Sequence, residues 1–236
     1  IVQDEMARVS APPTINGLGI RFIGPTIIVH GTEAHKKRHL QKILTAEEIW
    51  CQLYSEPNAG SDLASLKTRA EDQGDHFVVN GQKIWTSSGP IADWGILLCR
   101  TDPKVAKHRG ISCVLLNMRQ PGVEVRPLKQ ITGSSLFSEV FMTNARAEKS
   151  DLIGSLNQGW EIAQTTLSYE RGGSSLARVT RFAAAFRQLL RAVRTLRRNG
   201  RTLLEDPAVR AKLGRIFVDL EVQRYAALRI LSTLEK

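Results

Sequence analysis

The spacing of apolar residues changes twice along this chain of 236 residues, and that change limits the folds open to it. Between residues 48 and 152, short runs rich in Val, Ile, Cys, Trp and Phe alternate with Gly, Asn, Asp and Pro, a pattern typical of an antiparallel sheet or barrel. After residue 159 the apolar residues recur every three or four positions, as on one face of a helix. We therefore expect an α+β protein in which helices, a sheet and long helices follow one another.

The elements predicted from this pattern fall into three stretches. Thr32 and Glu33 have the character of a helix start, and apolar residues follow them at helical spacing. The Asn-Gly pair at residues 80–81 predicts a hairpin turn, and the pair at 199–200 predicts the end of a long helix. Strands are predicted at residues 49–54, 77–79, 94–100, 111–117, 123–128 and 136–143, and a second long helix at 207–234.

Positive charge is concentrated in the last third of the chain. The sequence holds 33 Lys and Arg against 23 Asp and Glu, a net charge of +10. Residues 1–152 contain 18 basic and 16 acidic residues, whereas residues 153–236 contain 15 and 7, so the two parts carry +2 and +8. Such an excess is found in nucleic-acid-binding proteins. Arginines on a helix face are more often simply solvated, however, and no aromatic residues alternate with these for base stacking, so we do not expect a nucleic-acid partner.

Composition excludes several classes of protein. With 42% hydrophobic and 24% charged residues, the chain is neither disordered nor a disulfide scaffold, and it can bury a sizeable core. No apolar run approaches the ~18 residues of a membrane span.

The three cysteines, Cys51, Cys99 and Cys113, are widely spaced within apolar runs. This pattern favours buried thiols in a reducing compartment such as the bacterial cytoplasm and lacks the spacing of a metal site. Both ends of the sequence look cut, because it opens on Ile1 and stops within a helical pattern.

Two polar segments between the predicted strands are candidates for chemistry. In residues 54–62, Pro57 fixes a turn and Gly60 lets the backbone approach a ligand, while the N–H groups of such a turn can bind an anion. An ordinary surface loop with a Ser-Asp helix cap explains the same residues. In residues 80–89, Trp85 precedes hydroxyl residues at a strand end, where its indole could cover a flat aromatic ligand. A half-buried Trp on a sheet is the commoner structure.

Together the two segments resemble the acyl-CoA dehydrogenase family. The resemblance lies in Glu56-Pro57-x-x-Gly60-Ser61-Asp62, followed some twenty residues later by Asn80-Gly81-Gln82-Lys83-x-Trp85. Two further segments fall in the family's order, Gly31-Thr32-Glu33-x-x-Lys36 before them and Leu167-Ser168-Tyr169-Glu170-Arg171 after them. The resemblance covers residues 31–198, which is most of the chain.

The resemblance implies a flavoenzyme of three domains. Residues 1–47 would end an N-terminal helical domain, residues 48–152 would form a middle antiparallel β-barrel that binds flavin, and residues 153–236 would begin a C-terminal helical bundle. FAD would lie between sheet and bundle, usually across a dimer contact in a tetramer. Ser55 would lie near the pyrimidine side of the ring, and Ser87 would offer a hydrogen bond near N5. The residues carried over as FAD-binding are Gln52, Leu53, Tyr54, Ser55, Gly60, Ser61, Trp85, Thr86 and Ser87.

The resemblance also implies a reaction of fatty-acid β-oxidation. A carboxylate removes the α proton of an acyl-CoA while the β hydride passes to the flavin, and the electrons go on to an electron-transfer flavoprotein. Isovaleryl and long-chain members place this base on the first helix after the barrel, directly before an Arg, which here is Glu170 before Arg171. We expect Glu170 to be the base, and Ser61, Ser168 and Arg171 to contact the substrate. A plain Glu-Arg pair on a helix surface is the alternative.

One family motif is replaced in this chain. Where members usually have Arg-x-x-Phe-Gly, which contacts the FAD of a neighbouring subunit, this sequence has Arg197-Arg198-Asn199-Gly200-Arg201-Thr202-Leu203. That contact would be lost or made by a different subunit, so both a homotetramer and a hetero-oligomer are open. The alternative function is a nucleic-acid-binding or non-catalytic hetero-oligomer member of the same family.

Overall fold

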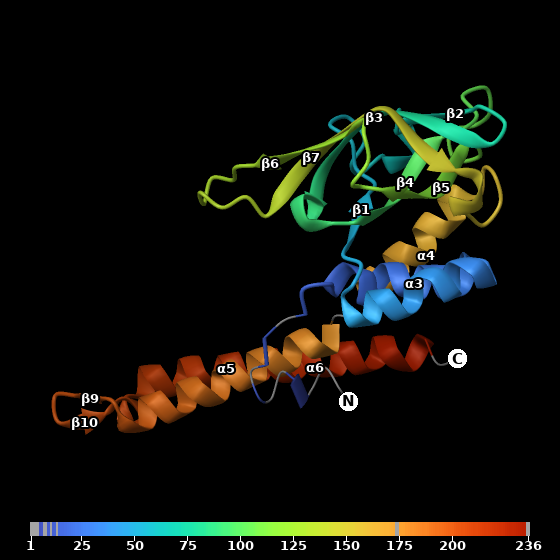
Figure 1. The fold of residues 1–236 in the computed structure, drawn as a ribbon. Helices are drawn as coiled ribbons and strands as arrows, with labels where there is room; N and C mark the ends of the chain where they lie inside the picture. The colour runs from blue at the N-terminus through green and yellow to red at the C-terminus, as the bar shows by residue number, and fades with distance from the viewer. Residues whose placement is uncertain (1–4, 7–8, 10, 13, 173–174, 235–236) are drawn as a thin grey trace. The chain divides into compact units, whose positions relative to one another are not determined.

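The computed structural model describes residues 5–6, 9, 11–12, 14–172 and 175–234 (Figure 1). The chain divides into two compact units, which are described separately. Residues 14–169 form the sheet unit, and residues 1–13 with 170–236 form the helical unit.

Three consecutive helical segments open the sheet unit. They are a π-helical turn η1 (Gly19–Ile23), α2 (Gly24–His30) and α3 (Glu33–Thr45). The start of α3 follows from reciprocal capping, because Thr32 Oγ1 accepts from His35 N at 3.3 Å and His35 Nδ1 accepts from Thr32 N at 3.1 Å. The predicted helix start at Thr32 is thereby confirmed.

Eight strands form one twisted sheet in the order β6-β7-β3-β2-β4-β5-β8, with β1 paired to β4. Most neighbours are antiparallel, as predicted, but β1 and β2 both pair with β4 in parallel. The predicted strands 77–79 and 136–143 are parts of longer ones. The eight strands of the sheet are β1 Trp50–Leu53, β2 Arg69–Asp72, β3 His76–Ser87, β4 Trp94–Arg100, β5 Ile111–Asn117, β6 Val123–Leu128, β7 Phe137–Glu148 and β8 Leu152–Ile153. Short 3-10 turns lie at η2 Leu63–Ser65, η3 Gly89–Ile91 and η4 Lys149–Asp151.

The hairpin predicted at residues 80–81 is wrong. Asn80 and Gly81 lie inside β3, where the register with β7 shifts between Val79 and Gly81. Gly81 has a φ of 156° and lies so close to Thr68, the residue before β2, that a Cβ would be 2.4 Å from Thr68 Oγ1. The pair therefore forms a bulge in a long strand, which glycine permits because it has no side chain.

Alternating side chains build a core on each face of the sheet. On β4, Ile96 and Leu98 pack with Ile27 and Ile43 of the helices, whereas Leu97 packs on the opposite face. Both faces are thus covered, which explains the almost unbroken apolar runs of β4 and β5. Burial raises the pKa of the Cys51 and Cys99 thiols to about 12. All three cysteines are buried and free, as predicted: Cys51, Cys99 and Cys113.

Helix α4 (Gly159–Gly172) follows β8, and two long helices follow α4. Those two helices, α5 (Ser175–Thr195) and α6 (Pro207–Leu234), run side by side as a hairpin within the helical unit (Figure 1). The predicted helix at 207–234 is confirmed. The predicted end of α5 at residues 199–200 is wrong, because the helix stops at Thr195.

A small β-hairpin follows α5 instead. Strands β9 (Arg197–Arg198) and β10 (Arg201–Thr202) pair through a two-residue turn, and a 3-10 turn η5 (Leu203–Glu205) leads into α6. The turn residues Asn199 and Gly200 have φ values of 52° and 76°, the left-handed pair that an Asn-Gly hairpin turn requires.

Candidate functional site

The first candidate segment begins where β1 ends. Leu53 is fully buried in the core, and Gln52, on the other face of the strand, is half-buried. Tyr54 is also buried, and its hydroxyl donates to Thr166 Oγ1 of α4 at 2.9 Å. These three predicted FAD-binding residues are therefore held mainly by the fold, and of them Gln52 has the most accessible side chain.

Backbone and side-chain bonds hold the loop after β1 against β3. Ile84 N donates to Ser55 O at 2.9 Å, and Lys83 Nζ donates to Tyr54 O at 2.9 Å. The half-buried Ser55 is thereby fixed beside the end of β3, where Trp85 and Ser87 lie. The structure thus brings together the two segments that the sequence places about thirty residues apart.

Trp85 adopts a backbone conformation that is rare for a bulky residue. Its φ is 61°, and the β3–β7 register is interrupted between Lys83 and Thr86. The indole is 58% exposed and touches the protein edge-on at Phe137, with ring centroids 5.9 Å apart. Strained backbone of this kind persists only where the surroundings enforce it, and it is concentrated at ligand sites. An exposed indole on such a bulge is suited to cover a flat ligand.

The hydroxyls beside Trp85 differ in what they can reach. Ser87 is half-buried and pairs with Phe137 at the end of the ladder. The Thr86 side chain is 1% exposed, and its Oγ1 has no hydrogen-bond partner among the described residues. A ligand lying against Trp85 can therefore meet the side chain of Ser87 but only the backbone of Thr86.

Gly60 and Ser61 lie in the exposed part of the loop. A Cβ on Gly60 would have no described atom within 4 Å, so the structure leaves open space there. Asp62 precedes η2 and accepts from Ser65 Oγ at 2.5 Å and from Lys107 Nζ at 2.7 Å. A cavity of about 260 Å³ borders the same loop and is lined by Glu56, Pro57, Asn58, Ala59, Ser65, Lys67, Thr68, Gly81 and Gln82.

The residues predicted to meet the substrate are on α4. Ser168 is exposed, and its Oγ donates to Thr165 O within the helix at 2.7 Å. Glu170 is exposed, lies one turn beyond Thr166 and belongs to the helical unit. The side chain of Arg171 lies outside the described part of the chain.

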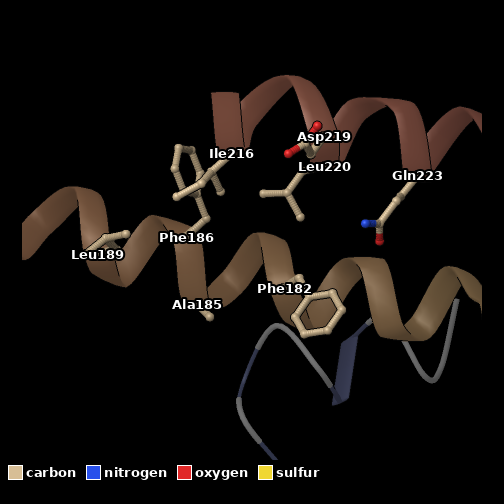
Figure 2. Close-up of a pocket in the computed structure, with 8 residues that line it drawn as sticks. All are labelled: Phe182, Ala185, Phe186, Leu189, Ile216, Asp219, Leu220 and Gln223. Atoms are coloured by element: carbon tan, nitrogen blue, oxygen red, sulfur yellow. The ribbon is translucent and has the colours of Figure 1, made fainter. Parts of the chain in front are cut away.

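A different hollow lies within the helical unit. About 340 Å³ in volume, it opens between α5 and α6, and Figure 2 shows Phe186 and Leu220 directed toward the space between the two helices. Its lining is mostly apolar, with Asp219 and Gln223 on α6 as the polar members. None of the predicted site residues lines it.

A buried ion pair beneath the loop was not among the predicted site residues. Lys83 is fully buried, and its Nζ lies 2.9 Å from Glu56 Oε1. Glu56 belongs to the first family motif and Lys83 to the second, and nothing else in the sequence indicates that they form a pair.

Neither a metal site nor a membrane helix is present in the parts of the chain that the structure covers. Among the described residues, no group of three His, Cys, Asp or Glu side chains could hold a metal ion. None of the described helices has the length and apolar character needed to cross a bilayer.

Two family models match this chain. Residues 51–148 match the acyl-CoA dehydrogenase middle domain, and residues 157–236 match the acyl-CoA dehydrogenase C-terminal domain. Together they cover most of the sequence.

Similar proteins bear related names. Acyl-CoA dehydrogenase IpdE1 of Mycobacterium tuberculosis is 42% identical over 225 residues, which are 95% of this chain and 57% of that protein. A solved structure described as the Tcur3481-Tcur3483 steroid ACAD aligns with a TM-score of 0.88 at 34% identity, over 99% of this chain and 59% of that one. The ChsE4-ChsE5 complex from Mycobacterium tuberculosis aligns with a TM-score of 0.84 at 32% identity, over 99% and 60%. The chain thus spans less than two thirds of these relatives.

Proposed function

The chain belongs to the acyl-CoA dehydrogenase family, and from this premise we propose that it catalyses FAD-dependent α,β-dehydrogenation of an acyl-CoA thioester to the trans-2-enoyl-CoA. The observation that carries the proposal is the position of Trp85. Its exposed indole stands on a strained bulge beside Ser55 and Ser87, in the motifs that the family shares.

These residues fit the ring of a flavin. An exposed aromatic face offers stacking, and two half-buried hydroxyls beside it offer hydrogen bonds to polar ring edges. Trp85 would cover the ring, Ser87 would bond near N5, and Ser55 would bond on the pyrimidine side. Bound there, FAD would supply the acceptor for a hydride.

Glu170 is proposed as the base for the other half of the reaction. Its carboxylate would take the α proton of the thioester as the β hydride leaves, so one proton and one hydride are removed and a carbon–carbon double bond forms. Hydrogen bonds to the thioester oxygen would stabilise the developing enolate. Ser61, Ser168 and Arg171 are proposed to hold the CoA ester. Exclusion of water from the carboxylate would strengthen its action as a base.

The proposed partners follow from the reaction and from the relatives. The proposed reaction removes two electrons from the acyl-CoA, and we propose an electron-transfer flavoprotein as their final acceptor. A dimer or tetramer is also proposed, and a second type of subunit is reasonable because one similar structure is a complex of two proteins, ChsE4 and ChsE5. Because another is described as a steroid ACAD, CoA thioesters of bulky polycyclic acids belong among the candidate substrates.

Loss of flavin colour under anaerobic conditions tests the proposal. The protein, purified with FAD, is mixed with a panel of straight-chain, branched and polycyclic acyl-CoAs while the visible absorbance is followed. We expect at least one of them to bleach the wild type and to leave Glu170→Gln oxidised. Glu161→Gln, an exposed carboxylate on the same helix, is the matched control and should bleach normally. Bleaching that survives Glu170→Gln would refute Glu170 as the base, and a protein that binds no FAD would refute the proposed function.

A further inference from the structure

Lys83 is a charged residue in the middle of a strand, and none of its side chain is exposed. An ammonium group in such a place is unfavourable unless it is paired and hydrogen-bonded. The Lys83 Nζ donates to two oxygens, Tyr54 O and Glu56 Oε1, each at 2.9 Å. Both acceptors belong to the loop after β1, so the charge ties this loop to β3.

Glu56 completes the arrangement. Its carboxylate accepts from Lys67 N at 2.6 Å and from Thr68 N at 2.8 Å, in addition to Lys83. Burial alone would raise the pKa of Glu56, but the Lys83 charge and these hydrogen bonds hold that pKa below its usual value. The ionised Glu56 carboxylate therefore connects three separate segments, which are its own loop, the residues before β2, and β3.

The contacts made by residues 83 and 84 come directly before the bulge. Lys83 Nζ donates to Tyr54 O and to the Glu56 carboxylate, and Ile84 N donates to Ser55 O, so Ser55 and the residues before and after it are all bonded to β3. Trp85, with its left-handed φ, is the next residue of β3. A residue in that conformation needs surroundings that enforce it, and the Lys83 anchor is two residues away.

We propose that the buried Lys83–Glu56 pair is a positioning device for the flavin site. It fixes the separation between Ser55 and the segment from Trp85 to Ser87, so that both sides of the site are in place before the ligand arrives. Buried ion pairs contribute little net stability compared with apolar side chains of similar size, whereas their directed bonds specify one arrangement. The inference rests on the proposed function, since it concerns the same site.

The test compares the wild type with Lys83→Met/Glu56→Gln, which removes both charges and keeps the side-chain volumes close. We measure the Kd for FAD, the visible spectrum of the bound flavin, and hydrogen exchange in residues 81–88 of the flavin-free protein. In the double variant we expect the Kd to rise at least tenfold, the flavin spectrum to shift, and the Ile84 amide to exchange at least tenfold faster.

Two control variants distinguish a specific effect on the flavin site from a general loss of protein stability. Lys107→Met breaks the exposed Lys107–Asp62 pair of the same loop and should change none of the three measurements. Leu97→Ala opens a cavity in the core of the same unit and should lower the unfolding midpoint while leaving the flavin spectrum unchanged. If the double variant fails to fold, Glu56→Asp replaces it, because this variant keeps a negative charge beside Lys83 but shortens the side chain that joins the loop to β3. We expect the same three changes in Glu56→Asp at a smaller size.

The outcomes are distinct. Unchanged FAD affinity and unchanged exchange at Ile84 would overturn the inference. A wild type that binds no FAD would refute the proposed function together with the flavin part of this inference, and the exchange measurement would still decide whether the pair holds the two segments together.

Discussion

The Tyr54 hydroxyl donates a hydrogen bond of 2.9 Å to Thr166 Oγ1 and so joins the residue after β1 to the middle of α4. Thr166 Oγ1 also lies 2.9 Å from Thr26 Oγ1 of α2, and all three side chains are buried. These hydroxyls connect two helices and a strand within the sheet unit. Because Ser55 is the next residue after Tyr54, the network also fixes one side of the candidate site.

Removing the Tyr54 hydroxyl should destabilise the sheet unit. Tyr54→Phe keeps the ring in the core and deletes one buried hydrogen bond, for which we expect a loss of about 1 kcal/mol in the free energy of unfolding. Urea unfolding of the flavin-free protein measures it. Tyr225→Phe, at a ring that is 65% exposed, is the control and should change stability by less than ~0.5 kcal/mol. Equal stability of the two variants would show that the network does not contribute.

Gly81 should tolerate a methyl group less well than another glycine with a positive φ. Gly74 has a φ of 91° and open space around it. Gly74→Ala should therefore lower the free energy of unfolding by about 1 kcal/mol, mainly because alanine disfavours this backbone conformation. Gly81→Ala would place a Cβ 2.7 Å from the Cα of Thr68, and we expect a loss of about 1–3 kcal/mol from this overlap. Chemical unfolding of both variants gives the comparison. A smaller loss at Gly81 than at Gly74 would contradict the packing of β3 against Thr68.

The two Asn-Gly pairs show how far local sequence determines structure in this protein. The pair at residues 80–81 has the better hairpin context in the sequence, yet it forms a bulge, since β3 continues along β7 as far as Ser87. The pair at 199–200 predicts a helix end from the apolar pattern before it, yet it forms the hairpin turn. Only the pair at 199–200 adopts the left-handed φ values of an Asn-Gly turn. Which element contains each pair depends on strand pairing, a long-range property that the dipeptide does not encode.

The candidate site was predictable to a similar extent. Its exposed members, such as Trp85, Gly60 and Ser61, lie in the two motifs and could be predicted from the sequence. The burial of Lys83 could not be derived from the residue type, because Lys is almost never fully buried unless it is paired, and the partner Glu56 lies 27 positions away. The burial of Thr86 depends on the irregular register around Trp85, which also requires the structure.

Stability should fall below neutral pH partly because of His39. Its side chain is fully buried and packs edge-on against both Trp50 and Trp94, and burial lowers its pKa despite the 2.7 Å hydrogen bond to Glu48. The unfolded chain therefore binds a proton at this residue more readily than the folded protein. The contribution of His39 is complete above about pH 6.5 and is lost as the pH falls toward the lowered pKa, with a slope of at most about 1.4 kcal/mol per pH unit.

The variant His39→Asn isolates this contribution. An amide nitrogen can take the place of Nδ1 toward Glu48 but does not titrate, so the variant is expected to be less stable at pH 8 yet to lose less stability between pH 7 and pH 5. Unfolding midpoints in urea across this range give both slopes. If the wild type and the variant had parallel profiles, His39 would be excluded as the cause.

Glycine should be more stable than alanine at position 85, which reverses the usual order within a strand. Trp85→Ala and Trp85→Gly both remove the indole and its contact with Phe137, so they differ only in how easily the backbone adopts a φ of 61°. A positive φ is strained for alanine, which has a Cβ, but not for glycine. We therefore expect the free energy of unfolding of the flavin-free protein to be about 1 kcal/mol higher for the Gly variant. The same two substitutions at Val78, where β3 pairs regularly with β7, should give the opposite order. The affinities of the two Trp85 variants for FAD should fall equally, because the indole makes the proposed contact. If Trp85→Ala were as stable as Trp85→Gly, the bulge would have to relax once the indole is removed.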